Sequence, residues 1–313
     1  AMGLMTAGAL TAALSGSLPM VAPAVNHNLP ADALPIWPFM FVVIACGAIS
    51  GFHSLVASGT SPKQVSREPD ALFVGYGSML MEGALAVLVL VCVGAGIGMA
   101  LKTGEGTVLT GKAAWSHQYA SWIGAKGLTD KIEPVVIGAA NMMETIGLNR
   151  ALGMTLIGVF IASFAGTTLD TSVRLQRYVV SELAADLKLK KLSNRWAATS
   201  FAVITAAVLA FATGANGTGA MTLWPLFGTA NQLLAALALL VVTIYLRKKG
   251  GFRFLVTAIP CLIMLTITNW AMIKNEMGFI QDQKWLLSTI GSLIFVLSLW
   301  MTLETLIVFL RKK

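Results

Sequence analysis

Polar residues interrupt an apolar segment that runs from about residue 38 to residue 56. The stretch Cys46–Ser54 holds two glycines, two serines and a histidine where a plain spanning helix would carry Leu, Ile or Val. Backbone leaves helical geometry at membrane depth only where it is buried in protein or lines a cavity. In secondary transporters, such broken helices hold substrate and coupling ions near the midplane. We therefore expect a substrate cavity to be lined by Gly47, Ser50, Gly51, His53 and Ser54.

Two ionisable side chains lie inside apolar segments. His53 follows the glycine-rich break, and an imidazole can exchange a proton near neutral pH. A hydrogen bond from His53 to a neighbouring helix is the alternative. Glu82 lies about 15 Å along the segment that starts near residue 72, at 1.5 Å per residue. A charge at that depth is costly and typical of ion pathways, so we expect Glu82 to carry a proton or ion. The alternative for Glu82 is an ion pair or a bond to helix backbone.

A dense run of hydroxyl groups around a carboxylate forms the second cluster, at Gly166–Ser172. Hydroxyls and unwound backbone carbonyls are the oxygen ligands that hold Na⁺ in carriers. Back-bonding of Thr and Ser to their own helix is the alternative interpretation. Pairing of the carboxylate with Arg174 or Arg177 is another. The pattern predicts ion coupling at Thr167, Thr168, Asp170 and Thr171, with the first two and Thr171 as possible Na⁺ ligands.

Three further polar residues lie in predicted spans. Asn231 and Gln232 follow Trp224 by roughly two turns of helix. Amides at that depth either bond across helices or contact substrate, and both interpretations remain open. Glu304 lies near the end of the last span, where a long side chain can reach the membrane surface.

The composition places all these residues in a membrane protein. The chain is 56% hydrophobic and 12% charged, whereas soluble domains carry about 25% charged residues. Uncharged apolar runs of about 20 residues, enough to cross a bilayer as helix, recur along the sequence. A polytopic all-α fold follows. The net charge of +8 is explained by basic cytoplasmic loops, so nucleic-acid binding is not expected.

About eight transmembrane helices are predicted, with interfacial or re-entrant helices in a long connection at 101–149. The predicted spans are 1–16, 36–57, 72–100, 150–184, 195–213, 221–246, 253–273 and 286–310. If these spans alternate in direction, one side receives about twice as many of the 22 Lys and Arg residues as the other. The positive-inside rule then predicts a cytoplasmic C-terminus and an external 101–149 connection.

Four motifs together resemble one family. They are Ala45–Val56, Gly75–Gly83, Phe164–Thr171 with its continuation to Tyr178, and Leu223–Leu234. In these four motifs the chain resembles the carbon starvation protein A (CstA) family. The resemblance implies a secondary transporter of the bacterial inner membrane, made under carbon starvation. It would import peptides, or a small carboxylate such as pyruvate, in symport with H⁺ or Na⁺.

The resemblance also implies a LeuT-like fold of two inverted five-helix repeats. Within a single membrane domain, 1–313, the second repeat would be 36–246 with 101–149 as its external loop. The helix 1–16 would end the first repeat, and 253–310 would add two peripheral helices. The chain opens without a signal peptide, inside an apolar helix. We therefore expect an N-terminal repeat upstream as a partner, without which the chain would not transport.

Two other classes of function are alternatives to a transporter. A channel would use the same polar helices to line a pore, and a non-transporting sensor or scaffold subunit would need no substrate path. An enzyme is not expected, because no motif such as H-E-x-x-H or G-x-S-x-G occurs. No cofactor is predicted beyond the coupling ion.

Overall fold

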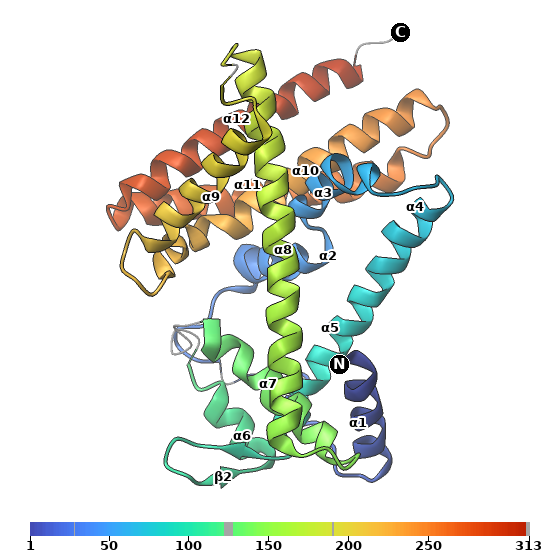
Figure 1. The fold of residues 1–313 in the computed structure, drawn as a ribbon, viewed down its shortest axis with the longest axis vertical. Coiled ribbons are helices and arrows are strands. Elements are labelled where there is room, and N and C mark those ends of the chain that lie inside the picture. The colour runs from blue at the N-terminus through green and yellow to red at the C-terminus, as the bar shows by residue number, and fades with distance from the viewer. Residues whose placement is uncertain (28, 122–127, 190, 311–313) are drawn as a thin grey trace. The chain divides into compact units, whose positions relative to one another are not determined.

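The computed structural model describes residues 1–27, 29–121, 128–189 and 191–310 (Figure 1). The elements are, in chain order, α1 (Met2–Leu14), η1 (Ile36–Met40), α2 (Phe41–Ala48), α3 (Gly51–Gly59), η2 (Ser61–Lys63), α4 (Asp70–Leu72), η3 (Phe73–Gly77), α5 (Ser78–Gly94), η4 (Gly96–Gly98), β1 (Leu101–Lys102), β2 (Val108–Leu109), α6 (Gly111–Gln118), α7 (Leu128–Glu144), α8 (Arg150–Asp186), α9 (Arg195–Phe211), η5 (Thr218–Leu223), α10 (Trp224–Lys248), α11 (Leu255–Gln281) and α12 (Trp285–Leu310). The turns η1 and η3 are π-helical, and the other η elements are 3₁₀.

The predicted all-α fold is confirmed. Strands in the described residues are limited to the two-residue antiparallel pair β1–β2. Six helical segments are long and apolar enough to cross a membrane, and each matches a predicted span: Ile36–Lys63, Asp70–Gly98, Arg150–Asp186, Thr218–Lys248, Leu255–Gln281 and Trp285–Phe309. The other two predicted spans are the shorter apolar helices α1 and α9. The inverted repeat stays a prediction.

Two compact units make up the chain. The first unit comprises Ala1–Leu34 and Ser66–Asp170, and the second comprises Pro35–Val65 and Thr171–Lys313. The division falls within α8, between Asp170 and Thr171.

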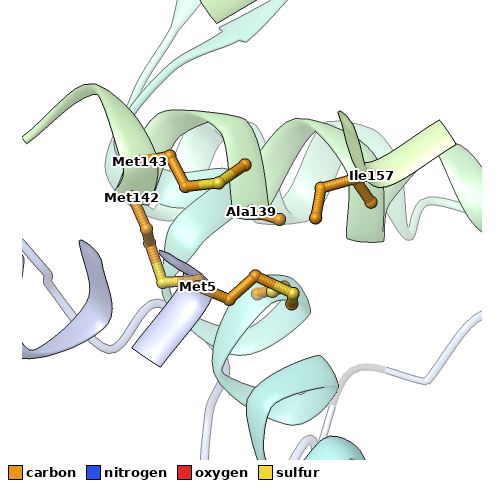
Figure 2. Packing of buried hydrophobic residues seen from close by; sticks show 6 residues of the cluster. Met5, Ala139, Met142, Met143 and Ile157 are labelled. Carbon is orange, nitrogen blue, oxygen red and sulfur yellow. The ribbon is translucent and has the colours of Figure 1, made fainter. Parts of the chain in front are cut away.

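Helix α7 forms the centre of the first unit and packs against α1 and α5. Their contact is a sulfur-rich cluster whose buried members are Met5, Cys92, Ala139, Met142, Met143 and Ile157 (Figure 2). Flexible methionines fill irregular gaps between helices. The backbones approach closely at Gly138, where a Cβ would collide with the Cys92 carbonyl oxygen. This packing fixes the end of α5 against α7.

The connection 101–149 contains a hairpin and two helices, α6 and α7, in its described part. Asn141 of α7 donates to the carbonyls of Gly96 at 2.9 Å and Ala100 at 2.8 Å, where the chain leaves α5. Helices in this connection were predicted and are present, while their interfacial position stays a prediction. Residues 122–127 of this predicted connection lie outside the described residues.

Helix α10 forms the centre of the second unit, where it packs on α2, α3, α11 and α12 (Figure 1). One buried cluster joins α2, α10 and α11 and consists of Ala45, Ala236, Cys261, Met264 and Leu265. Another joins α10, α11 and α12 and consists of Leu226, Leu233, Met272, Phe279 and Leu287. Both clusters hold α10 in a fixed register against its neighbours.

Helix α11 is longer than the sequence predicts. The predicted span ended at 273, because Lys274, Asn275 and Glu276 follow in the sequence, whereas the helix continues to Gln281. The polar residues are accommodated by neighbouring helices. Asn275 Nδ2 lies 3.3 Å from Thr229 Oγ1 of α10, and Glu276 accepts hydrogen bonds from α12. Interhelical bonds of this kind let polar side chains remain within a spanning helix.

Candidate functional site

The predicted helix break lies between α2 and α3. Helix α2 ends at Ala48, Ile49 has φ −137° and ψ 84°, and Ser50 is extended with φ −91° and ψ 128°. Helix α3 then begins at Gly51, inside the candidate span Ile36–Lys63. The break therefore falls inside the predicted stretch Cys46–Ser54. It leaves the last carbonyls of α2 and the first amides of α3 without partners in their own helices.

Asn231 of α10 bridges the break. Its Oδ1 accepts a hydrogen bond from the Phe52 backbone N–H at 2.7 Å, and its Nδ2 donates to Ser50 Oγ at 3.1 Å and Cys46 Sγ at 3.0 Å. Ser50 holds the N-cap position of α3 but makes no capping bond with its own side chain. Asn231 thus supplies that cap from another helix, and its side chain is only 7% exposed.

Gly51 allows the close approach that this bridge needs. A Cβ at Gly51 would collide with the Asn231 carbonyl oxygen and would lie 2.7 Å from Leu234 Cβ and 2.8 Å from the Ala235 nitrogen. Only glycine lets the start of α3 contact the α10 backbone in this way. The glycine that the sequence assigned to the cavity is therefore also a packing residue.

The other residues predicted at the break differ in their surroundings. Ser54 Oγ donates to the Gly51 carbonyl at 2.6 Å, one turn back in its own helix. Gly47 and His53 are both exposed, and the space around Gly47 is open. The structure brings Ser50, Gly51 and Asn231 together, while His53 stands apart from that contact.

Gln232 is fully buried with its amide unsatisfied. Its side chain is 0% exposed, and within the described residues neither Nε2 nor Oε1 has a hydrogen-bond partner. An unpaired buried amide is costly and calls for a ligand, a water or a second conformation. Gln232 is therefore the predicted site residue with hydrogen-bonding capacity to spare.

The hydroxyl cluster lies on an unbroken part of α8. Thr167 Oγ1 donates to the Ser163 carbonyl at 3.0 Å, and Thr168 Oγ1 donates to the Phe164 carbonyl at 3.1 Å. These are the back-bonds that the sequence offered as the alternative. The expected unwound carbonyls are absent, because every residue of α8 is helical. Asp170 is exposed at the end of the first unit, and Thr171 begins the second.

Glu82 is exposed in the first unit, early in α5. Three predicted ion-coupling residues, Glu82, Thr167 and Thr168, thus belong to the first unit, and the residues of the break belong to the second. Their functional roles stay predictions.

One carboxylate inside a candidate span is not among the residues predicted from the sequence. Glu276 of α11 accepts hydrogen bonds from Ser288 at 2.9 Å and Ser292 at 3.1 Å, both on α12. It was overlooked because it lies beyond the predicted end of its span. The spacing of Ser288, Gly291 and Ser292 on one face of the next helix was the available signal.

Comparison with known proteins decides the family. The model of the family described as "Carbon starvation protein CstA" matches residues 2–271. The chain belongs to the carbon starvation protein CstA family. Every site residue predicted from the sequence lies within the region matched by the CstA family model, whereas Glu276 lies beyond it.

Named CstA-family relatives are transporters. The chain is 32% identical over 296 residues to the peptide transporter CstA of Helicobacter pylori strain J99, covering 83% of this chain and 42% of the relative. It is 31% identical over 296 residues to the pyruvate/proton symporter BtsT of Escherichia coli K12, covering 76% and 41%. It is 33% identical over 291 residues to the peptide transporter CstA of Mycobacterium tuberculosis H37Rv, covering 79% and 38%.

The chain spans about two fifths of the length of these curated CstA-family relatives. No solved structure matches it.

Proposed function

We propose that the complete protein is a secondary active transporter that imports peptides or a small carboxylate such as pyruvate. Two observations support this. The relatives include peptide transporters and a pyruvate/proton symporter. The observation that carries the proposal is the break at Ile49–Ser50 inside a candidate membrane span, bridged by Asn231. The second inverted repeat of a LeuT-like fold is the architecture we propose around it.

The break offers chemistry suited to a carboxylate. The start of α3 is the positive end of a helix dipole, and half-helices of this kind point at anionic substrate groups in carriers. A peptide C-terminus and pyruvate share a carboxylate. We propose that Gly47, Ser50, Gly51, His53 and Ser54 line the substrate cavity at this end. Gln232, with an unsatisfied amide, supplies a further donor and acceptor as the cavity opens.

Coupling to a cation completes the proposal. The name of one relative includes proton symport, which favours H⁺ over Na⁺. His53 and Glu82 are the proposed protonatable groups. If Na⁺ is the coupling ion, its proposed ligands lie at Thr167, Thr168 and Thr171, beside Asp170.

The proposed setting is the bacterial inner membrane under carbon starvation. The bilayer and an N-terminal repeat from the rest of the protein are the proposed partners, with the C-terminus in the cytoplasm.

The test is uptake of radiolabelled dipeptides and pyruvate by the complete protein in proteoliposomes, under imposed H⁺ or Na⁺ gradients. Accumulation that depends on one gradient is the expected result, and it identifies substrate and ion together. Equilibration that ignores both gradients would indicate a channel. No flux of either substrate would indicate a sensor or scaffold.

The assigned coupling residues are tested in the same assay. Glu82→Gln and Asp170→Asn are each expected to lower gradient-driven uptake at least about tenfold, equivalent to about 1.4 kcal/mol in the barrier. Glu304→Gln, at an exposed carboxylate near the end of α12, serves as the control and should keep wild-type uptake. Wild-type uptake by both test variants would refute the assigned roles.

A further inference from the structure

A carboxylate is enclosed between α11 and α12. Glu276 lies five residues before the end of α11, inside the candidate span Leu255–Gln281. Its Oε2 accepts hydrogen bonds from Ser288 Oγ at 2.9 Å and Ser292 Oγ at 3.1 Å. The two serines are one turn apart on α12 and face the same carboxylate. We name Glu276, Ser288, Gly291 and Ser292 the Glu276 cradle.

Gly291 makes room for the second carboxylate oxygen. A Cβ at this position would collide with Glu276 Oε1. Oε1 is buried and has no hydrogen-bond partner in the described residues. One oxygen of the carboxylate is thus saturated by hydroxyls, and the other faces glycine backbone with its lone pairs unused.

The charge of the cradle is also unbalanced. No ion pair joins Glu276 to a basic side chain in the part of the chain that the structure describes, and nearby Lys284 pairs with Asp282 at 2.7 Å. Glu276 is half-buried, so its unbalanced negative charge loses part of its hydration, which carries a cost. A positive charge that enters the cradle would remove this cost.

We propose that the Glu276 cradle binds one monovalent cation, sodium. Its ligands are the two carboxylate oxygens and the hydroxyl oxygens of Ser288 and Ser292, with water completing the shell. A hydroxyl can donate to Oε2 while its lone pairs face a cation. One carboxylate balances one positive charge, whereas Ca²⁺ takes six to eight oxygen ligands that include several carboxylates. No group of three or more His, Cys, Asp or Glu side chains that could hold a metal ion occurs in the described residues.

The cradle lies close to the end of α11 and the start of α12. Ser288 lies about 5 Å along the axis from Trp285, the first residue of α12, at 1.5 Å per residue. Tryptophan and lysine at a helix start are typical of the membrane surface. A cation therefore reaches the cradle from water without crossing the apolar centre. The proposal does not depend on transport, and the cradle lies beyond the region matched by the family model.

The test measures sodium binding through thermal stability of the complete protein in detergent. Sodium chloride is compared with choline chloride at equal ionic strength and constant pH. A ligand near 100 times its dissociation constant raises the melting temperature by about 2 °C in a chain as long as the curated relatives. Wild type should show this shift, Glu276→Gln should lose it, and Glu304→Gln should keep it.

A second variant separates binding from folding. Ser288→Ala combined with Ser292→Ala keeps the carboxylate and should raise the sodium concentration at half-effect at least about tenfold. A sodium shift that persists in Glu276→Gln, or that is absent from wild type, would overturn the proposal. A melting temperature that follows pH but ignores sodium would also overturn it, and would assign the cradle to a proton.

Discussion

At the scale of single residues, the break in the spanning helix depends on one glycine and one asparagine. Gly51 lets α3 contact the α10 backbone, and Asn231 then caps α3 from outside. Neither residue could do this alone, because the cap requires the close approach. Gly51, which is predicted to line the cavity, therefore also helps to hold the break in place.

Replacing Gly51 by alanine tests the close approach. The added methyl group collides with backbone atoms that cannot move independently, so Gly51→Ala should lower the free energy of unfolding by about 2 kcal/mol. Gly47→Ala is the matched control on the same broken helix, where the space is open. It should leave stability unchanged or raise it by up to about 1 kcal/mol. Denaturant unfolding of the complete protein measures both, and equal losses would contradict the packing role of Gly51.

Removing the Asn231 side chain tests the bridge. Asn231→Ala leaves the Phe52 amide and Ser50 hydroxyl unpaired, so a loss of about 1–3 kcal/mol is expected. Asn275→Ala is the comparison, because that amide spans α10 and α11 through longer contacts of 3.3 and 3.5 Å. A smaller loss is expected there. Melting temperatures of the two variants in detergent distinguish them, and a larger loss for Asn275→Ala would refute the bridge.

At the scale of elements, neighbouring helices determine where polar residues can lie. Helix α11 continues past Glu276 because α10 and α12 supply hydrogen bonds to its polar end. Helix α8 stays regular through its hydroxyl cluster because Thr167 and Thr168 bond to their own backbone. Whether a polar residue ends a helix or is accommodated within it therefore depends on the segments that pack beside it.

The short helix α6 gives a prediction about pH. Tyr119, which follows α6, packs on Trp115 with ring centroids 4.3 Å apart, and burial raises the pKa of Tyr119 from 10.0 to about 12. Because the folded pKa lies above the unfolded one, this contribution to stability is present below about pH 10 and is lost as pH rises toward 12. Tyrosinate absorbance should show a late step that Tyr119→Phe removes.

A control for this titration is Tyr178→Phe, at a residue near the end of α8. That variant keeps Tyr119 and should therefore keep the late step. A late step that survives Tyr119→Phe would contradict the assignment.

At the scale of the whole molecule, contacts within the second unit show which segment ends lie together. Arg247 lies over the Phe309 ring at 3.5 Å, which brings the basic end of α10 beside the end of α12. Lys63 lies over the Tyr178 ring at 3.9 Å and joins the connection after α3 to the end of α8. Each pair belongs to the side that the charge pattern assigned to the cytoplasm.

The C-terminal orientation can be tested with fusions to the complete protein. A fluorescent protein after residue 313 should fluoresce, because that reporter folds in the cytoplasm, and alkaline phosphatase there should be inactive. The same reporters inserted between β1 and β2 should give the opposite pattern, since 101–149 is predicted external. Active phosphatase at the C-terminus would invert the proposed topology.

The sequence by itself determined the class of protein, six candidate spans and the place of the break. Crossing a bilayer requires long apolar helices, so composition and length reveal them locally. Glycine and serine within an apolar run mark broken backbone for the same local reason. The motifs at Ala45–Val56 and Leu223–Leu234 were enough to predict the family that the comparisons confirmed.

The tertiary structure decided which polar groups meet. Asn231 and Phe52 are 179 residues apart, and the sequence left Asn231 open between packing and substrate contact. Glu276 lies beyond the predicted end of its span, and only the register of α11 against α12 brings two serines and a glycine to it. Helix register depends on packing between distant segments, and local sequence carries no record of it.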